Sequence, residues 1–264
     1  TVAIYSDGDS NEPFVRDADE GWALDGMPAP ETYLDMDKVL AAAESSGADA
    51  IHPGYGFLSE NAVFAKKCSE QGIEFIGPEH RVLKLFGDKV QARQLAESLS
   101  IPTIPGSKDA LDSVGAAKEV AQAIGYPIML KASSGGGGRG MRAVTNEKEM
   151  EEAFERCASE AKSSFGDERL FLEKLIERPR HIEIQILADK HGDIIHLFER
   201  DCSIQERNQK VIEIAPAPNL DPTLLDQLYK DAKNIAKETG YTNAGTVEFL
   251  VTPETGEYFF IECN

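Results

Sequence analysis

Residues 125–144 read GYPIMLKASSGGGGRGMRAV, and this stretch decides the fold of the central part of the chain. Its apolar residues stop at the glycine run and resume at Met141, as in two short strands. Strand, glycine loop and strand together predict a hairpin, whose exposed backbone N–H groups could close over phosphates. A flexible linker is the commoner use of four glycines, but two strands this close leave little room for a domain boundary.

Residues 135–140 (GGGGRG) also satisfy the pattern GxGxxG, which occurs in other phosphate-binding loops. A Walker A loop would end in Gly-Lys-Ser/Thr, but Met141 follows Gly140. A dinucleotide-binding loop would lead into a helix, whereas residues 141–144 favour a strand. A protein-kinase loop would be followed by HRD and DFG triplets, which are absent. A hairpin lid is the use that remains.

Lys131 lies in the apolar strand that precedes the glycine loop. A lysine there loses hydration unless it is paired or functional, so Lys131 is a candidate site residue. A side chain that reaches the surface is an equally open alternative.

Two glutamates lie inside apolar strands near the end of the sequence. Glu248 belongs to TVEFLV, and Glu262 and Asn264 end the stretch YFFIECN. The intervening TPETG predicts a hairpin turn, and alternation puts Glu262 and Asn264 on one face. Converging carboxylate and amide oxygens suit Mg²⁺. Solvent-facing glutamates are the alternative, and a glycosidase pair is disfavoured because aromatic-rich loops are missing.

Outside these two hairpins, apolar spacing predicts an α/β first part and a mainly antiparallel α+β second part. In HIEIQILAD, the isoleucines face one side of a strand, and His181, Glu183 and Gln185 face the other. We predict helices over 35–46, 60–71 (with Ser59 as its cap), 88–99, 113–124, 147–164 and 223–239, and strands over 1–5, 73–78, 170–176, 193–199 and 211–215.

The composition restricts the kinds of partner. The chain has 264 residues and a net charge of −19, and no basic run, so nucleic-acid binding is not expected. A ligand such as ATP would need locally gathered lysines. The four cysteines are scattered, which favours a reducing compartment. No apolar run approaches a membrane span, no signal peptide is present, and the strands at both ends suggest a piece of a longer chain.

Several long strings, in order along the whole chain, resemble biotin carboxylases. They are HPGYGFLSEN, FIGP followed by GDK, the glycine loop, EKLIERPRHIEIQILAD, ERDCSIQ, QKVIEIAPAP, GTVEFL and FFIECN. The resemblance implies an ATP-grasp fold preceded by a partial Rossmann-like α/β domain. The implied domains are a partial pre-ATP-grasp domain (1–76), a helical linker (77–102), the lid subdomain (103–175) and a partial antiparallel-sheet domain (176–264).

The resemblance also implies roles for individual residues. Phosphates would contact Lys89 and Lys131 beneath the lid, and Lys210 would reach toward bicarbonate as the catalytic residue. The implied lid residues are Gly135, Gly136, Gly137, Gly138, Gly140 and Met141. The implied nucleotide site also includes Glu173, Lys174, Ile176, His181, Gln205, Asn208 and Leu250. The implied metal ligands are Glu248, Glu262 and Asn264.

The chain departs from the family pattern in two ways. The family usually has Arg-Arg-His-Gln-Lys where this chain has Glu206 to Lys210, so Glu206 adds negative charge. Asn208 can donate a hydrogen bond but carries no charge, as in the urea-carboxylase branch and some acyl-CoA branches. The family's opening strand and the segment after Asn264 are missing. That segment supplies the general base and a biotin-side arginine, so we expect the fragment alone to be inactive.

The implied reaction is ATP-dependent carboxylation of biotin by bicarbonate through carboxyphosphate, with Mg²⁺ or Mn²⁺ and biotin as carried substrate. The implied partners are a biotin carrier, a carboxyltransferase component and a second copy of the chain, in the cytoplasm or the mitochondrial matrix. Phosphoryl transfer depends mainly on positioning and charge neutralisation, which suits lysines, metal and backbone N–H groups. Two alternatives are another ATP-grasp ligase, such as a carbamoyl-phosphate synthetase half, and a non-catalytic nucleotide-binding module.

Overall fold

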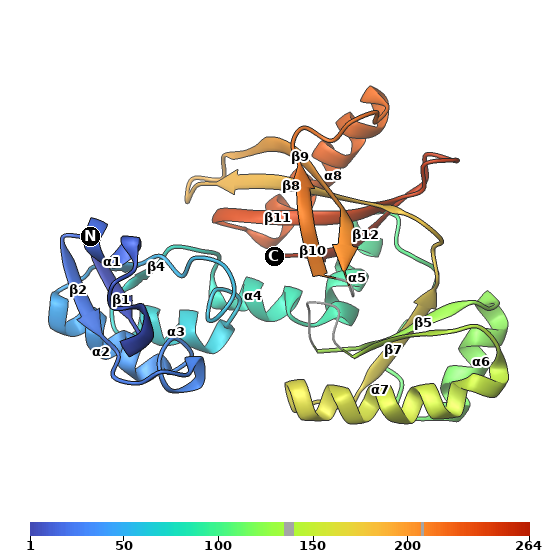
Figure 1. Ribbon diagram of the computed structural model, residues 1–264. Coiled ribbons are helices and arrows are strands. Elements are labelled where there is room, and N and C mark those ends of the chain that lie inside the picture. The colour runs from blue at the N-terminus through green and yellow to red at the C-terminus, as the bar shows by residue number, and fades with distance from the viewer. Residues whose placement is uncertain (135–139, 207–208) are drawn as a thin grey trace. The chain divides into compact units, whose positions relative to one another are not determined.

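The computed structural model describes residues 1–134, 140–206 and 209–264 (Figure 1). The chain divides into two compact units. Unit 1 comprises residues 1–84 and 241–243, and unit 2 comprises residues 85–240 and 244–264. Among the helices of the described residues, none is long and apolar enough to cross a membrane.

Unit 1 contains two small parallel sheets with helices beside them, which confirms its predicted α/β class. β1 (Val2–Tyr5) pairs with β2 (Glu20–Ala23), and β3 (Ala50–Ile51) pairs with β4 (Glu74–Phe75). The core includes Val39, Leu40, Phe64, Cys68 and Phe75. The helical segments are η1 (Asp7–Asp9), α1 (Pro13–Asp17), η2 (Ala29–Glu31), α2 (Met36–Ser46), α3 (Ala62–Glu70) and α4 (His80–Phe86), which crosses the boundary between the units.

The start of α3 corrects one detail of the sequence analysis, because Asn61 rather than Ser59 caps this helix. The Asn61 carboxamide oxygen accepts hydrogen bonds from the backbone N–H groups of Val63 and Phe64, both at 3.0 Å. Both residue types are good caps, and the loop geometry decides between them.

Replacing Asn61 with alanine should lower the free energy of unfolding by about 1 kcal/mol, because two N–H groups lose their acceptor. Urea-induced unfolding monitored by circular dichroism measures this change. Ser59→Ala is the matched control and should leave the unfolding midpoint unchanged. Equal losses in both variants would contradict the assignment of the cap.

The first part of unit 2 contains the glycine hairpin that the sequence predicts. β5 (Ile128–Ala132) pairs antiparallel with β6 (Met141–Val144) and with β7 (Leu170–Lys174). Gly140 has a φ of +66°, and an added Cβ would lie 3.1 Å from Ala132 Cβ, so the end of the loop requires glycine. Leu130, Val144, Met150, Cys157 and Leu172 belong to a core that this sheet shares with helices α6 (Val114–Ile124) and α7 (Met150–Phe165), and η3 (Glu147–Glu149) precedes α7.

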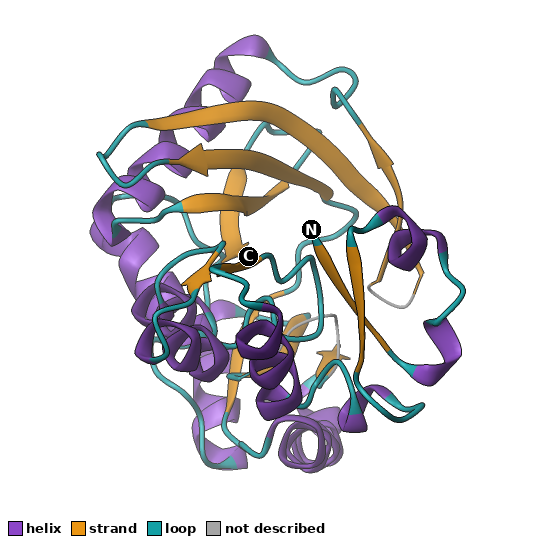
Figure 2. Ribbon diagram, turned by 90° about the vertical axis from the view of Figure 1, so that its left-hand side faces the viewer, coloured by secondary structure: helices purple, strands orange, loops and turns teal. Residues whose placement is uncertain are grey.

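The second part of unit 2 is a five-stranded sheet in the order β10-β9-β8-β11-β12. Helix α8 (Pro222–Thr239) lies along one face, and α5 (Lys89–Ser98) packs beside β12 (Figures 1 and 2). Ile182, Ile184 and Ile186 are fully buried, whereas His181 and Gln185 remain partly accessible, as the predicted alternation requires. The strands are β8 (Arg180–Ala188), β9 (Ile194–Glu206), β10 (Gln209–Ile214), β11 (Asn243–Val251) and β12 (Tyr258–Cys263).

Strand β9 is longer than the sequence predicts, because it continues from the expected end at residue 199 to Glu206. The extension contains the charged pair Arg200 and Asp201, which is unusual inside a sheet. Arg200 pairs with Glu183 on the neighbouring strand, and Asp201 pairs with Arg180. These cross-strand ion pairs offset the loss of hydration and allow the strand to continue.

Candidate functional site

A cavity of about 340 Å³ in unit 2 collects most of the predicted site residues. Both sheets and helix α5 contribute to its walls, and its size is typical of small-molecule sites. The predicted residues that line it are Lys89, Lys131, Met141, Glu173, Lys174, Ile176, His181, Gln205, Leu250 and Glu262.

One part of the cavity wall is apolar and suits a flat aromatic base. Met129 and Phe171 from the smaller sheet and Leu250 from β11 contribute to this wall. Lys174 also lines the cavity, but its ammonium group donates to the carbonyl oxygens of Gly125 and Tyr126, at 3.1 and 2.9 Å. Its aliphatic stem therefore remains for contact with a ligand.

Glu248 and Glu262 are direct cross-strand partners in the hairpin of β11 and β12. The register shifts between Glu248 and Phe249, because Phe249 pairs with Phe260 and leaves Ile261 as an extra residue. Such a β-bulge changes the direction of side chains along a strand. Both glutamates lie on the same side of the hairpin, as the metal-site prediction requires.

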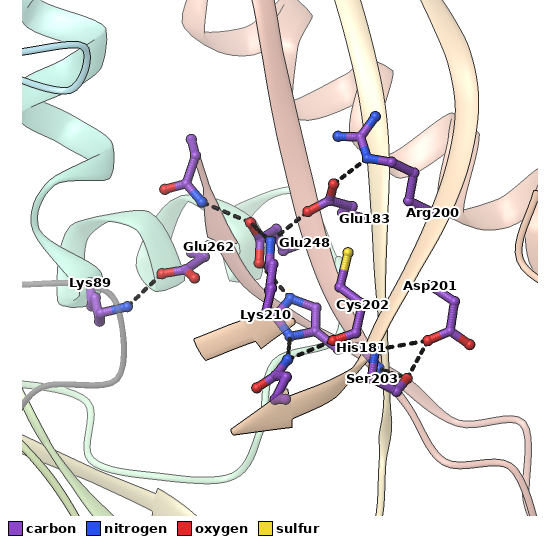
Figure 3. A network of polar contacts seen from close by, with 12 residues as sticks. Lys89, His181, Glu183, Arg200, Asp201, Cys202, Ser203, Lys210, Glu248 and Glu262 are labelled. Atoms are coloured by element: carbon purple, nitrogen blue, oxygen red, sulfur yellow. Dashed lines mark hydrogen bonds and ion pairs between the residues drawn. The ribbon is translucent and has the colours of Figure 1, made fainter. Parts of the chain in front are cut away.

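Glu248 is only 1% exposed and contacts three donors from different segments (Figure 3). Its Oε1 accepts hydrogen bonds from Lys210 Nζ at 2.7 Å and from Asn264 Nδ2 at 2.8 Å. Its Oε2 contacts His181 Nε2. A buried carboxylate is stable as an anion only with such partners, so Glu248 organises the residues around it.

Lys210 lies between two carboxylates, with Glu183 at 2.5 Å and Glu248 at 2.7 Å (Figure 3). Burial alone would lower the pKa of Lys210, but attraction to Glu248 and the two hydrogen bonds raise it above its ordinary value. Burial opposes ionisation of Glu183, yet Lys210 and then Arg200 lower its pKa. Lys210 is therefore a fixed cation at neutral pH and cannot serve as a base there.

His181 is held by a chain of hydrogen bonds on the cavity side of the sheet. Gln205 Nε2 donates to His181 Nδ1 at 2.8 Å, so the Nε2 proton faces Glu248. The backbone N–H of His181 donates to Ser203 Oγ at 2.9 Å, and Ser203 Oγ contacts Asp201. These contacts fix both the tautomer and the position of the imidazole.

The two lysines predicted to contact phosphates are each paired with a carboxylate. Lys89 Nζ lies 2.7 Å from Glu262 Oε2, and Lys131 pairs with Glu173. Attraction to Lys89 lowers the pKa of Glu262 to about 2. Burial alone would lower the pKa of Lys89, but Glu262 raises it. The pair of Lys89 and Glu262 is therefore ionised at neutral pH.

The oxygens of Glu248, Glu262 and Asn264 fit a hard divalent cation such as Mg²⁺ or Mn²⁺. Glu262 is the accessible member of the set, because its side chain is 25% exposed and lines the cavity. Asn264 donates through its nitrogen to Glu248 Oε1, and its amide oxygen is the atom of this side chain that could ligate a metal. The donor set contains two carboxylates, as expected for a metal that also binds substrate phosphates.

A second group of potential ligand atoms comprises Glu183, Cys202 and Glu213, and it fits a metal less well. Glu183 is already paired with Lys210 and Arg200. Burial raises the pKa of the Cys202 thiol to about 12, so the thiolate required for metal binding does not form at neutral pH.

Several residues of the site were not predicted as functional from the sequence. Glu183 and Arg200 hold Lys210 in place, and Asp201 and Ser203 support His181. Alternation along HIEIQILAD places Glu183 on the face of His181 and could have identified it. Gly135, Gly136, Gly137, Gly138 and Asn208 lie outside the described residues, and Gly140 packs against Ala132 rather than lining the cavity.

Comparison with known proteins gives matches along the whole chain. Residues 1–83 match the biotin carboxylase N-terminal domain, and residues 88–264 match the family described as carbamoyl-phosphate synthase L chain, ATP binding domain. The pyruvate carboxylase of Bacillus subtilis is 52% identical over 265 residues, covering 100% of this chain and 23% of that protein. The biotin carboxylase of Halalkalibacterium halodurans is 50% identical over 264 residues, covering 100% of this chain and 58% of that protein.

Among solved structures, the biotin carboxylase domain dimer of the Hydrogenobacter thermophilus 2-oxoglutarate carboxylase has a TM-score of 0.95 at 48% identity. The match covers 100% of this chain and 58% of that one, and that protein was solved with MgADP, ADP and bicarbonate. The chain thus spans between 23% and 58% of the length of these three proteins. On the matches along its whole length and the ATP-grasp architecture that it shares with solved relatives, the chain belongs to the biotin carboxylase family.

Proposed function

We propose that this chain supplies the ATP- and metal-binding part of an enzyme that carboxylates biotin with bicarbonate. The observation that carries the proposal is the convergence of Lys89, Lys131 and Glu262 on one cavity with an apolar wall, with Glu248 buried beside Glu262 as its cross-strand partner. Such a site combines a slot for a base with charges for phosphates and a metal.

In the proposed complex, the adenine lies against Leu250, Met129 and Ile176, with backbone contacts at Glu173 and Lys174. All five residues line the cavity. Lys89 and Lys131 contact the phosphates, and Lys131 directly precedes the glycine loop segment whose N–H groups would cover them. The proposed roles of Gly135 to Gly138, of Gly140 and Met141, and of Asn208 at the ribose rest on the family resemblance.

Glu248, Glu262 and Asn264 would hold Mg²⁺ or Mn²⁺ beside the phosphates. The metal, when bound, would neutralise charge that develops on the transferred phosphoryl group. His181 and Lys210 hold Glu248 in position, because both donate to its carboxylate in this structure.

Lys210 would bind bicarbonate as an anion. In the first step, a bicarbonate oxygen forms a bond to the γ-phosphorus while the bond to the β–γ bridging oxygen breaks, giving carboxyphosphate and ADP. The carboxyl group then passes to the deprotonated N1 of biotin, and phosphate leaves. Since the pKa of Lys210 is raised, this lysine contributes charge and orientation rather than proton abstraction.

The comparisons support the choice of ligands and partners. The Hydrogenobacter relative was solved with MgADP and bicarbonate as a domain dimer, which supports a homodimer here. The pyruvate carboxylase relative supports a biotin carrier and a carboxyltransferase component as partners. Cys68, Cys157, Cys202 and Cys263 are buried free thiols, which suits a reducing compartment such as the cytoplasm or the mitochondrial matrix.

Calorimetric titration of the intact protein with MgADP tests the nucleotide site. We expect binding that Lys131→Gln weakens about tenfold or more, because an ion pair with phosphate is lost. Glu168→Gln is the control, since Glu168 forms an exposed pair with Lys162 and does not line the cavity.

Formation of carboxybiotin from labelled bicarbonate tests the reaction, and formation of carbamoyl phosphate from ammonia instead would favour the alternative ligase.

A further inference from the structure

Both phosphate-binding lysines of the proposed site already have carboxylate partners, and this affects how ligands enter. Lys89 pairs with Glu262, and Lys131 pairs with Glu173 (Figure 3 shows the first pair). The pairs also interact with each other, because Glu173 acts on Lys89 and Lys131 acts on Glu262. The cavity is therefore lined by two lysines, each of which has a carboxylate partner.

A lysine that turns toward a phosphate weakens its pair with the carboxylate, which is costly in a partly buried site. Breaking a buried ion pair leaves an anion without compensation. The side chains of Lys89 and Glu262 are 19% and 25% exposed, so water replaces the lost partner only in part. Metal-free nucleotide gains a contact with Lys89 but leaves Glu262 unpaired.

The residue that Lys89 would release is one of the proposed metal ligands. We propose that Glu262 exchanges partners: it pairs with Lys89 in the empty site and with the divalent cation in the loaded site. The metal thereby releases Lys89 to the phosphates, and the nucleotide draws Lys89 away from the metal ligand. Metal and nucleotide then bind with positive coupling, which must be the same in both directions. This inference rests on the proposed function.

Glu248 provides a matched comparison within the same site. It is the second proposed metal ligand, but its hydrogen-bonding partners are His181, Lys210 and Asn264. Glu248 attracts Lys89 through space but is not its ion-pair partner, so removing the charge of Glu248 weakens metal binding and leaves the Lys89–Glu262 pair in place. If Glu262 and Glu248 were only metal ligands, replacing either one would have the same effect on the binding of metal-free nucleotide. The proposed exchange predicts different effects, because only Glu262 pairs with Lys89.

The experiment measures the dissociation constant of ADP by calorimetry in the intact protein, with EDTA and with saturating Mg²⁺. In Glu262→Gln we expect ADP to bind about tenfold more tightly than wild type in EDTA, with little further gain from Mg²⁺. Glu248→Gln should not tighten binding in EDTA. Glu168→Gln controls for the loss of one negative charge far from these pairs.

A second variant tests the exchange from the metal side. Lys89→Gln frees Glu262, so Mn²⁺ without nucleotide should bind about tenfold more tightly than in wild type, as read by electron paramagnetic resonance. If Glu262→Gln weakens metal-free ADP binding, or Lys89→Gln leaves Mn²⁺ affinity unchanged, the exchange is wrong. If wild type binds no ADP even with Mg²⁺, the proposed function itself fails.

Discussion

Replacing Lys210 with glutamine should lower bicarbonate-dependent carboxylation of biotin by about a hundredfold or more. In the proposed function Lys210 would bind bicarbonate, and two carboxylates hold its ammonium group at 2.5 and 2.7 Å. Glutamine keeps a donor but loses the charge that bicarbonate would meet. The KM for bicarbonate, measured in the intact enzyme at saturating MgATP, should rise along with the fall in kcat.

Lys210→Arg separates the charge from the shape of this side chain. Arginine retains a cation but cannot reproduce the position of one ammonium group between Glu183 and Glu248, so we expect partial activity. A Lys210→Gln enzyme with an unchanged KM for bicarbonate would remove Lys210 from the bicarbonate site. The pKa of Lys210 is raised above its ordinary value. The carboxylation rate of the wild-type enzyme should therefore not fall through loss of the Lys210 proton as the pH passes the ordinary pKa of a lysine.

Replacing Phe249 with alanine should destabilise the protein by about 3–5 kcal/mol. Phe249 is fully buried, and its ring makes edge contacts with Tyr258 and Phe260 at centroid distances of 6.0 and 6.3 Å. The substitution leaves a cavity directly behind the hairpin that carries Glu248 and Glu262. Urea-induced unfolding measures the loss, and carboxylation at a permissive temperature should fall with it.

Ile195→Ala on β9 is the control for truncation of an apolar side chain in the same sheet. Its side chain is 52% exposed, so we expect a change within about 0.5 kcal/mol. An equally small effect of Phe249→Ala would mean that the β11–β12 hairpin does not depend on this aromatic cluster.

The hairpins of this chain were predictable because local signals define them. The glycine run between two apolar strands predicted the pairing of β5 with β6, and TPETG predicted the pairing of β11 with β12. Alternation also predicted the burial of Ile182, Ile184 and Ile186. In each case the residues that interact are close in the sequence, or they alternate along a single strand.

The ion pairs of the site could not be predicted in the same way. Lys89 and Glu262 are 173 residues apart, and no local pattern links them. The extra residue at Ile261 could not be predicted either, because a β-bulge depends on the register of the partner strand. The predicted strand ended at residue 199, and the pairing of Arg200 and Asp201 with β8 extends it. Tertiary pairing decides these features, and a single sequence does not contain it.

The pairing of Lys89 and Lys131 with carboxylates also affects how the cavity binds the small anions of a cell. Inorganic phosphate or sulfate would compete with Glu173 or Glu262 for an ammonium group, and it offers no base for the apolar wall. A cavity with bare lysines would attract such ions, which are abundant and would compete with the nucleotide. The pairing of both lysines with carboxylates should therefore disfavour small anions relative to the nucleotide.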